Sequence, residues 1–207
     1  MTASQPAVLH SRDGVVLEAE YAAPPGTRRG TVVLCHPHPQ YGGTMRSIVI
    51  SALFEALPGA GIACLRFNFR GVEGSAGEHT GGEGEVEDVQ AAVDAAASGT
   101  VDGPLVLVGW SFGADMALSV VDARIAGWVA IAPPLRFRPD FDPVARDTRP
   151  KHLVLAQHDE FRSPSDVQAD VAPWNSITTE IVPGASHFFI GRTDRVITAT
   201  TEFVASL

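Results

Sequence analysis

The chain has 207 residues and a formal net charge of −9 at pH 7, with 45% hydrophobic and 19% charged residues. This balance is typical of a folded protein with a buried core and excludes a disordered chain, and the length favours one domain spanning residues 1–207. Because Lys and Arg form no cluster that would neutralise phosphates, we expect no nucleic-acid partner.

In chain order, apolar β-branched runs alternate with Ala-rich segments of helical spacing over most of the sequence. The predicted strands are residues 14–21, 31–36, 61–69, 104–110, 126–132, 152–157 and 176–182. The predicted helices are residues 45–57, 83–97, 112–122 and 193–205. Two strand runs, residues 31–35 and 105–108, are apolar on both faces, which is typical of central strands covered by helices on each side. The alternation therefore predicts an α/β fold with a mostly parallel, doubly wound sheet.

The beginning of the chain departs from this alternation. Residues 7–21 contain Asp13-Gly14, a pair typical of tight turns, and predict a hairpin that adds antiparallel strands to the edge of the sheet. Residues 133–150, which contain several Pro and Arg residues, are the least regular part of the sequence.

No segment of the sequence predicts a membrane anchor. Residues 1–14 lack the apolar core of a secretory signal, and the longest apolar run, residues 125–135, contains two prolines and is too short to span a bilayer. We therefore expect a cytoplasmic protein without a membrane partner. Cys35 and Cys64 lie in apolar runs where a free cysteine behaves as a small hydrophobe, and a reducing compartment disfavours a disulfide between them.

The clearest chemical signal is Gly109-Trp110-Ser111-Phe112-Gly113, which lies where a predicted strand gives way to a predicted helix. So sharp a turn strains the backbone of the serine and brings neighbouring main chain close, so glycine is needed on both sides of it. Reactive groups of such sheets lie at the carboxyl ends of the strands. The motif therefore predicts that Ser111 is a nucleophile, and the alternative is a glycine-rich turn with an incidental serine.

This segment resembles the nucleophile elbow of α/β-hydrolases, whose catalytic residues follow one another in the order nucleophile, acid, histidine. The sequence around Asp159 follows one predicted strand and resembles the acid loop of that family, and the sequence around His187 follows the next strand and resembles its histidine loop. The resemblance implies a catalytic triad of Ser111, Asp159 and His187. Glu160, which we expect to point away, would replace Asp159 if the register shifted by one residue. A helix-capping Asp159 and a surface His187 are the alternatives.

The run His36-Pro37-His38-Pro39-Gln40-Tyr41-Gly42-Gly43 follows the strand at 31–36. In the family, the corresponding loop supplies one backbone N–H of the oxyanion hole, and alignment gives the N–H of His38. Proline has no N–H, so His38 and then Gln40 are the available donors, and the N–H of Phe112 is expected as the second donor. We interpret His36 as a structural ring bonded to loop backbone.

A His-x-His pair can also bind a metal ion. No further ligands occur nearby at metal-site spacing, although His79 and Asp88 could approach in the fold. Because the nucleophile, the base and the oxyanion donors all come from the chain, we expect neither a metal nor an organic cofactor.

The His36–Gly43 run, together with Phe67-Asn68-Phe69-Arg70-Gly71-Val72-x-Gly74-Ser75-x-Gly77, resembles a group of compact bacterial α/β-hydrolases related to dienelactone-hydrolase-like and serine-aminopeptidase-like proteins. The resemblance covers nearly the whole chain. Glu73 stands where that group tends to have glycine. The charges of Arg70, Glu83, Glu85 and Asp88 are expected to be solvated, and the alternative is an ion-pair network behind the site.

Lids of this family follow the strand that here ends near Ala132, and the roughly twenty residues before the next strand leave no room for one. We therefore expect an open cleft bordered by Tyr41, Trp110, Phe112, Phe188 and residues 133–138, which binds a small or medium acyl substrate. Tyr41, Trp110 and Phe188 are the predicted substrate-binding residues.

These features together imply hydrolysis of a carboxylic ester or thioester through an acyl-serine intermediate, a carboxylesterase-like activity. The alternatives are a small-amide or peptide hydrolase, and a non-catalytic ligand-binding or scaffold protein with the same fold. A dinucleotide-binding module is excluded because no G-x-G-x-x-G follows the first parallel strand.

Overall fold

The computed structural model describes residues 4–98, 103–138 and 140–207 of the chain. Its strands are β1 (Ser4–His10), β2 (Val16–Ala22), β3 (Gly30–Cys35), β4 (Ile62–Phe67), β5 (Leu105–Trp110), β6 (Ile125–Ile131), β7 (Lys151–His158) and β8 (Ile177–Ser186). Its helices are α1 (Ile48–Ala56), α2 (Glu83–Ala96), α3 (Phe112–Leu118), α4 (Asp142–Arg146), α5 (Pro164–Val171) and α6 (Thr193–Ala205), with short 3₁₀ helices η1 (Pro39–Tyr41) and η2 (Leu57–Ala60). None of the helices in these ranges combines the length and the hydropathy needed to cross a membrane.

The strands form one sheet in the order β1-β2-β4-β3-β5-β6-β7-β8. β2 pairs antiparallel with β1 and with β4, and the other neighbouring pairs are parallel. The predicted fold class is therefore confirmed: each predicted strand and helix has a counterpart, and the amino-terminal hairpin forms β1 and β2 at the sheet edge.

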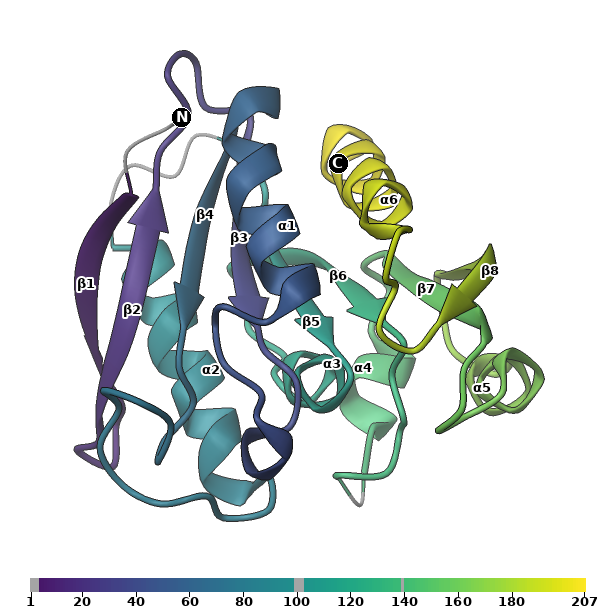
Figure 1. Ribbon diagram of the computed structural model, residues 1–207, viewed down its shortest axis with the longest axis horizontal. Helices are drawn as coiled ribbons and strands as arrows, with labels where there is room; N and C mark the ends of the chain where they lie inside the picture. The colour runs from purple at the N-terminus through teal and green to yellow at the C-terminus, as the bar shows by residue number, and fades with distance from the viewer. Residues whose placement is uncertain (1–3, 99–102, 139) are drawn as a thin grey trace.

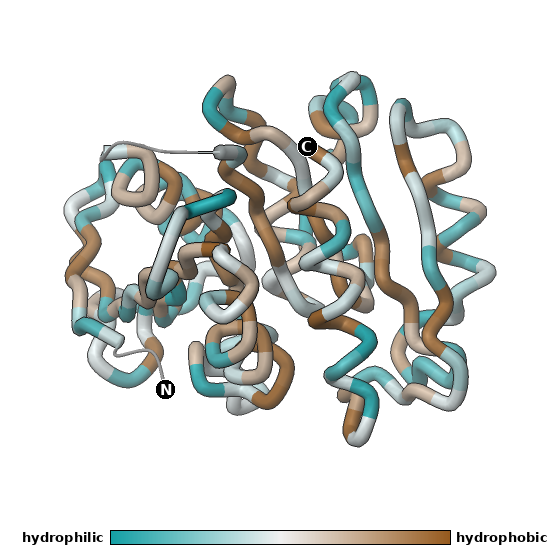
Figure 2. The backbone as a smooth tube through the Cα atoms, turned by 90° about the horizontal axis from the view of Figure 1, so that it is seen from above, coloured by the Kyte–Doolittle hydropathy of each residue, from teal (hydrophilic) through white to brown (hydrophobic). Residues whose placement is uncertain are grey.

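Helices cover both faces of the sheet, with α1 and α6 on one face and α2 and α3 on the other (Figure 1). Side chains alternate along each strand, so Val32 and Leu34 of β3 join the core beneath α1 and α6, while Val33 and Cys35 join the core beneath α2 and α3. Hydrophobic stretches accordingly run through the middle of the molecule, and hydrophilic ones gather in the outer turns (Figure 2). The central strands are buried on both faces, as their continuous apolar sequence predicts.

Helix α3 is four residues shorter than predicted and ends at Leu118. Beyond it, the side chain of Val120 is buried, and its carbonyl oxygen accepts a hydrogen bond of 3.1 Å from the indole N–H of Trp128 in β6. This tertiary contact replaces the next helical hydrogen bond. It turns the chain toward β6.

Two helices, α4 and α5, have no counterpart in the sequence prediction. The start of α5 does carry local signals: the Ser163 hydroxyl accepts a hydrogen bond from the N–H of Asp166, and Pro164 occupies the first helical position. Both helices belong to the side of the sheet covered by α2 and α3, since Val144, Val167 and Val171 are buried in that core.

The order of the strands creates a crevice at their carboxyl ends. The chain leaves β3 for β4 on one side and later returns to β5, which lies on the other side of β3. The loops after β3 and β5 therefore diverge, which is the arrangement that opens a binding site in doubly wound sheets. These loops carry the His36–Gly43 run and Ser111.

Candidate active site

Ser111 lies at a strained turn between β5 and α3. Its φ of 56° and ψ of −123° place it outside the regions that non-glycine residues ordinarily occupy. A Cβ atom on Gly109 would lie 2.1 Å from the carbonyl oxygen of Gly113, and one on Gly113 would lie 2.2 Å from that of Cys35. Glycine is therefore required on both sides of Ser111, as the motif predicts.

Ser111, His187 and Asp159 form one hydrogen-bonded series. Nε2 of His187 lies 2.9 Å from Oγ of Ser111, and Nδ1 lies 2.8 Å from Oδ2 of Asp159. The other carboxylate oxygen, Oδ1, accepts the N–H groups of Phe161 and Arg162 at 2.9 and 3.2 Å. The structure thus brings together the three residues that the sequence predicts. With Nδ1 protonated, Nε2 can accept the proton of the serine hydroxyl.

Glu160 does not point away from the site, so that expectation was wrong. Its Oε2 atom accepts the backbone N–H of His187 at 3.0 Å, while the indole N–H of Trp110 donates to the carbonyl oxygen of His187 at 3.1 Å. Asp159 contacts the ring and Glu160 contacts the main chain of the same residue. Two adjacent carboxylates therefore hold the same histidine, one at its ring and the other at its main chain.

Of the two residues predicted to supply oxyanion donors, Phe112 directly follows Ser111 and His38 lines the same cleft as Ser111. The N–H of Gln40 donates to Nδ1 of His38, so it is occupied. Within the described part of the chain, the N–H groups of His38 and Phe112 have no protein acceptor. The close approach of Gly113 to the carbonyl oxygens of Cys35 and His36 packs the start of α3 against the loop that carries His38. Both free N–H groups are thus available to a ligand oxygen.

His36 is completely buried and holds the loop after β3. Its Nε2 atom accepts the N–H of Phe69 at 3.0 Å, and its Nδ1 atom lies 2.6 Å from the carbonyl oxygen of Pro37. The ring is therefore neutral with the proton on Nδ1. Burial lowers its pKa to about 3. The interpretation of His36 as a structural ring is confirmed, and its bond to Pro37 fixes the peptide before His38.

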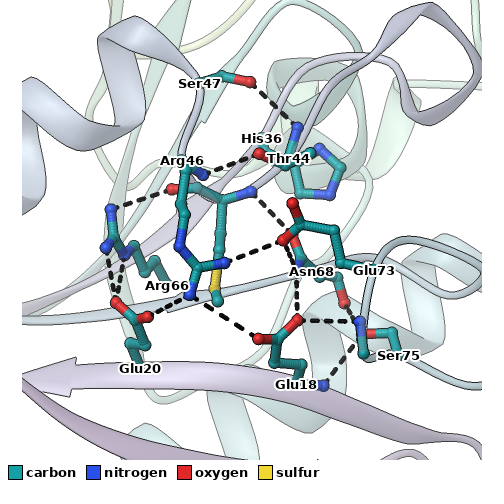
Figure 3. Close-up of polar contacts among 12 residues, drawn as sticks. Glu18, Glu20, His36, Thr44, Arg46, Ser47, Arg66, Asn68, Glu73 and Ser75 are labelled. Atoms are coloured by element: carbon teal, nitrogen blue, oxygen red, sulfur yellow. Dashed lines mark hydrogen bonds and ion pairs between the residues drawn. The ribbon is translucent and has the colours of Figure 1, made fainter.

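A polar framework supports the wall of the site next to this loop (Figure 3). Oδ1 of Asn68 accepts the N–H of Met45 at 2.8 Å, and the guanidinium of Arg66 donates to the carbonyl oxygen of Met45 at 3.2 Å. Arg66 is in turn paired with Glu20 at 2.6 Å. Because these contacts use the backbone of Met45, the predicted helix at 45–57 begins only at Ile48.

Glu73 belongs to the same framework (Figure 3). Its φ is 47°, in the left-handed region that favours glycine. Its carboxylate pairs with Arg46 at 2.9 Å and accepts a hydrogen bond from Asn68 at 2.9 Å. These contacts offset the strain of the backbone, and the loop keeps its turn without glycine.

The charges that we expected to be solvated are mostly buried, so that expectation was wrong. Arg70 is 5% exposed and Asp88 is fully buried, and the guanidinium donates to the Asp88 carboxylate at 2.7 Å and to Asp13 at 2.8 Å. Glu85 is fully buried as well and accepts the N–H groups of Thr80 and Gly82. An ion-pair network therefore exists among Arg70, Asp88 and Asp13, and the ion pairs of the described residues bring neither Glu83 nor Glu85 into it.

The placement of the described His, Cys, Asp and Glu side chains does not indicate a metal site. Among the described residues, no group of three or more His, Cys, Asp or Glu side chains is close enough to hold a metal ion. His79 lies 4.9 Å from His38 between ring centroids, but it pairs with Glu85 at 2.8 Å, and Asp88 is occupied by Arg70.

An open cleft of about 560 Å³ lies over Ser111 and His187. The predicted substrate-binding residues Tyr41, Trp110 and Phe188 all line it. Phe112 does not: its side chain is fully buried in the core, which corrects the expectation that it borders the cleft. The other lining residues are Pro37, His38, Gly42, Gly43, Ser47, Ile48, Pro134, Arg136, Phe137 and Phe161.

Asp115 is a site residue that the sequence analysis missed. It is completely buried in α3, and its carboxylate accepts the N–H groups of Leu135, Arg136 and Phe137 at 2.9 to 3.0 Å. Burial raises its pKa to about 6, against the lowering effect of these donors. The signal was an acidic residue within an otherwise apolar helix. Asp115 ties the cleft wall at 134–137 to the helix that follows Ser111.

Known proteins share this fold and part of the sequence. The model of the family described as "Serine aminopeptidase, S33" matches residues 26–172. An α/β serine hydrolase homologue from Coxiella burnetii is 32% identical, with a TM-score of 0.87 over 99% of this chain and 98% of that one. XC6422 from Xanthomonas campestris, described as an α/β serine hydrolase without a lid, is 29% identical, with a TM-score of 0.87 over 100% and 95%.

The fold likeness extends to the esterase Pf2001 from Pyrococcus furiosus, which is 19% identical, with a TM-score of 0.83 over 99% of this chain and 93% of that one. The fold, the lidless architecture and the family match agree with one another. The chain therefore belongs to the serine aminopeptidase S33 family and is a hydrolase of the α/β-hydrolase fold.

Proposed function

We propose that the protein hydrolyses carboxylic esters or thioesters through an acyl-serine intermediate, with Ser111, His187 and Asp159 as its catalytic triad. The observation that carries the proposal is the hydrogen-bonded series from Ser111 through His187 to Asp159 at the base of an open cleft. A serine hydroxyl is a weak nucleophile until a neutral imidazole takes its proton, and this series supplies that imidazole in the required orientation.

In the acylation step, Oγ of Ser111 attacks the carbonyl carbon while its proton passes to Nε2 of His187. The bond from that carbon to the leaving oxygen or sulfur then breaks, and the imidazolium returns the proton to the leaving group. In the second step a water molecule gives its proton to Nε2 and its oxygen attacks the acyl carbon. The acid departs and the Ser111 hydroxyl is restored. Asp159 stabilises the imidazolium in both steps.

The oxygen of the tetrahedral intermediates carries a negative charge that needs donors. The N–H groups of His38 and Phe112, which have no acceptor among the described residues, are suited to this role. His36 supports it indirectly, because its bond to Pro37 orients the peptide that precedes His38.

The lining of the cleft favours an ester over an amino-terminal peptide. A free α-ammonium group is bound most strongly by a carboxylate, but the described lining residues include no Asp or Glu, and Asp159 and Glu160 are engaged by His187. Apolar and aromatic side chains dominate the lining, which suits a small or medium acyl group. The fold shared with the Pyrococcus esterase agrees with this preference.

A fluorophosphonate probe tests the proposal, because it reacts only with an activated serine beside an oxyanion hole. The wild-type protein should be labelled once, at Ser111, and EDTA should not reduce the labelling. Labelling should disappear in Ser111→Ala and fall steeply in His187→Ala, and Ser119→Ala, at the end of the same helix, is the matched control. A folded wild-type protein that resists labelling, or full labelling of Ser111→Ala, would favour the non-catalytic binding protein instead.

A further inference from the structure

Arg136 is the one permanently charged side chain among the described residues that line the cleft. It is exposed, and within the described ranges no carboxylate pairs with its guanidinium, which lies 5.2 Å from the ring of Phe137. The neighbouring arginines are engaged: Arg162 pairs with Asp170, and Arg138 donates to the carbonyl oxygen of Gly82. Because no carboxylate of the described residues pairs with it, the Arg136 guanidinium is available to an anionic ligand group in the cleft.

The position of Arg136 is fixed relative to Ser111. The buried Asp115 accepts the N–H of Arg136 and those of the residues on either side of it. Asp115 belongs to α3, the helix that begins directly after Ser111. Helix α3 therefore joins Ser111 to the backbone of Arg136. Because this wall of the cleft is already ordered, binding of a ligand group by Arg136 costs little conformational entropy of the wall.

The charge of Arg136 acts inside the cleft. Burial foremost, and then the charges of His79 and Arg136, lower the pKa of His38, whereas Glu85 raises it. The guanidinium thus lies near enough to His38, another lining residue of the cleft, to affect its ring. The chain as a whole carries a net charge of −9, whereas Arg136 brings a positive charge into the cleft.

We propose that the natural substrate is an ester that carries a carboxylate in its acyl or alcohol part, and that Arg136 binds this group. The inference rests on the proposed function and names its substrate class. A guanidinium can donate two parallel hydrogen bonds to a carboxylate, a geometry that lysine does not reproduce. An ester with a neutral group in place of the carboxylate leaves the guanidinium unpaired, and an ester with a cationic group in that place is repelled.

Two matched pairs of alkyl esters test this inference. Monomethyl glutarate and methyl pentanoate differ by a carboxylate at the end of the acyl chain, and 4-acetoxybutanoate and butyl acetate differ in the same way on the alcohol side. The wild-type protein should favour the anionic member of at least one pair by about tenfold in kcat/KM, mainly through KM, as expected of a charge-assisted hydrogen bond. Methyl 4-(trimethylammonio)butanoate should be the poorest acyl substrate.

Variants assign the preference to Arg136. Arg136→Gln should bring the ratio of anionic to neutral ester close to one, Arg136→Glu should invert it, and Arg136→Lys should restore part of it. Arg12→Gln removes the same charge from the β1–β2 turn, where Arg12 is exposed and 3.5 Å from Asp94, and should leave the ratio unchanged. A preference that survives Arg136→Gln, or one that Arg12→Gln removes equally, would overturn the assignment.

Binding to Ser111→Ala, measured by saturation-transfer NMR on each ester pair, separates this inference from the proposed function. Preferential binding of the anionic ester without turnover by the wild-type protein would support carboxylate binding by Arg136 and refute the hydrolase mechanism. Turnover of both members at equal kcat/KM, with equal binding, would refute the inference and leave the mechanism standing. Neither turnover nor a binding preference would refute both.

Discussion

Replacement of His36 should change how the stability of the protein depends on pH. The ring is completely buried, accepts the N–H of Phe69 at 3.0 Å and has its pKa lowered from 6.5 to about 3, first of all by burial. In the unfolded chain the same imidazole takes up a proton near pH 6.5. Between these two values the unfolded state binds one more proton than the folded state, so stability falls as the pH falls.

The size of the effect follows from the gap between the two pKa values. Each pH unit is worth about 1.4 kcal/mol, so the loss reaches about 3 kcal/mol at pH 4.5 and about 5 kcal/mol once the pH approaches 3. Asp115 acts in the opposite direction: its pKa is raised by burial to about 6, so the folded state binds its proton first and gains stability as the pH falls from about 6 to 3.8. The contribution of His36 therefore has to be measured as a difference between variants.

The assay is urea unfolding of the wild-type protein and of His36→Gln at intervals from pH 6.5 to 4.5. His36→Gln removes the titrating ring, so the free energy of unfolding of the wild-type protein should fall about 1.4 kcal/mol per pH unit more steeply than that of the variant. His10→Gln, at the exposed end of β1, controls for the loss of an imidazole and should follow the wild-type slope. Parallel lines for wild type and His36→Gln would refute the reasoning.

Three further substitutions have expected outcomes. Gly113→Ala places a Cβ atom 2.2 Å from a carbonyl oxygen and should cost about 4 kcal/mol or more by thermal unfolding, whereas Gly59→Ala, with nothing within 4 Å, should change stability by no more than about 1 kcal/mol. Arg70→Met leaves the carboxylate of Asp88 buried without its cation and should cost about 3–5 kcal/mol in urea unfolding; a loss below about 1 kcal/mol would contradict the buried pair. Asp159→Asn should lower ester turnover roughly 10⁴-fold, less than the roughly 10⁶-fold expected for Ser111→Ala, and equal turnover with wild type would exclude Asp159 as the acid.

Local sequence signals predicted the strands and helices and the sharp turn at Ser111, and the resemblance to α/β-hydrolases added the other site residues. Continuous apolar runs indicate strands that are buried on both faces, and the two glycines around Ser111 indicate a turn that no other residue fits. Parallel strands bring their carboxyl ends to one edge of the sheet. For this reason three loops that are distant in sequence could be expected to meet, and Nε2 of His187 lies 2.9 Å from a serine 76 residues earlier in the chain.

Side-chain partners were harder to predict, because periodicity describes which face of an element is buried and not which polar group lies opposite. Arg70 and Asp13 are 57 residues apart, and only the tertiary structure brings the β1–β2 turn next to the loop after β4 that carries Arg70. The same holds for Glu160. Its hydrogen bond from the N–H of His187 depends on how the loop after β7 lies against the end of β8.

The sequence by itself therefore determined the fold class and the position of Ser111, since both depend on short-range rules for strands, turns and helices, and its resemblance to α/β-hydrolases indicated the loops of Asp159 and His187. Only the tertiary structure decided that Phe112 is buried beneath the cleft, that Asp115 holds the wall at 134–137, and that Arg136 faces the cleft without a carboxylate partner among the described residues. Those outcomes depend on how α3 packs against the sheet and the loop after β6, and such packing is set by contacts between residues far apart in the chain.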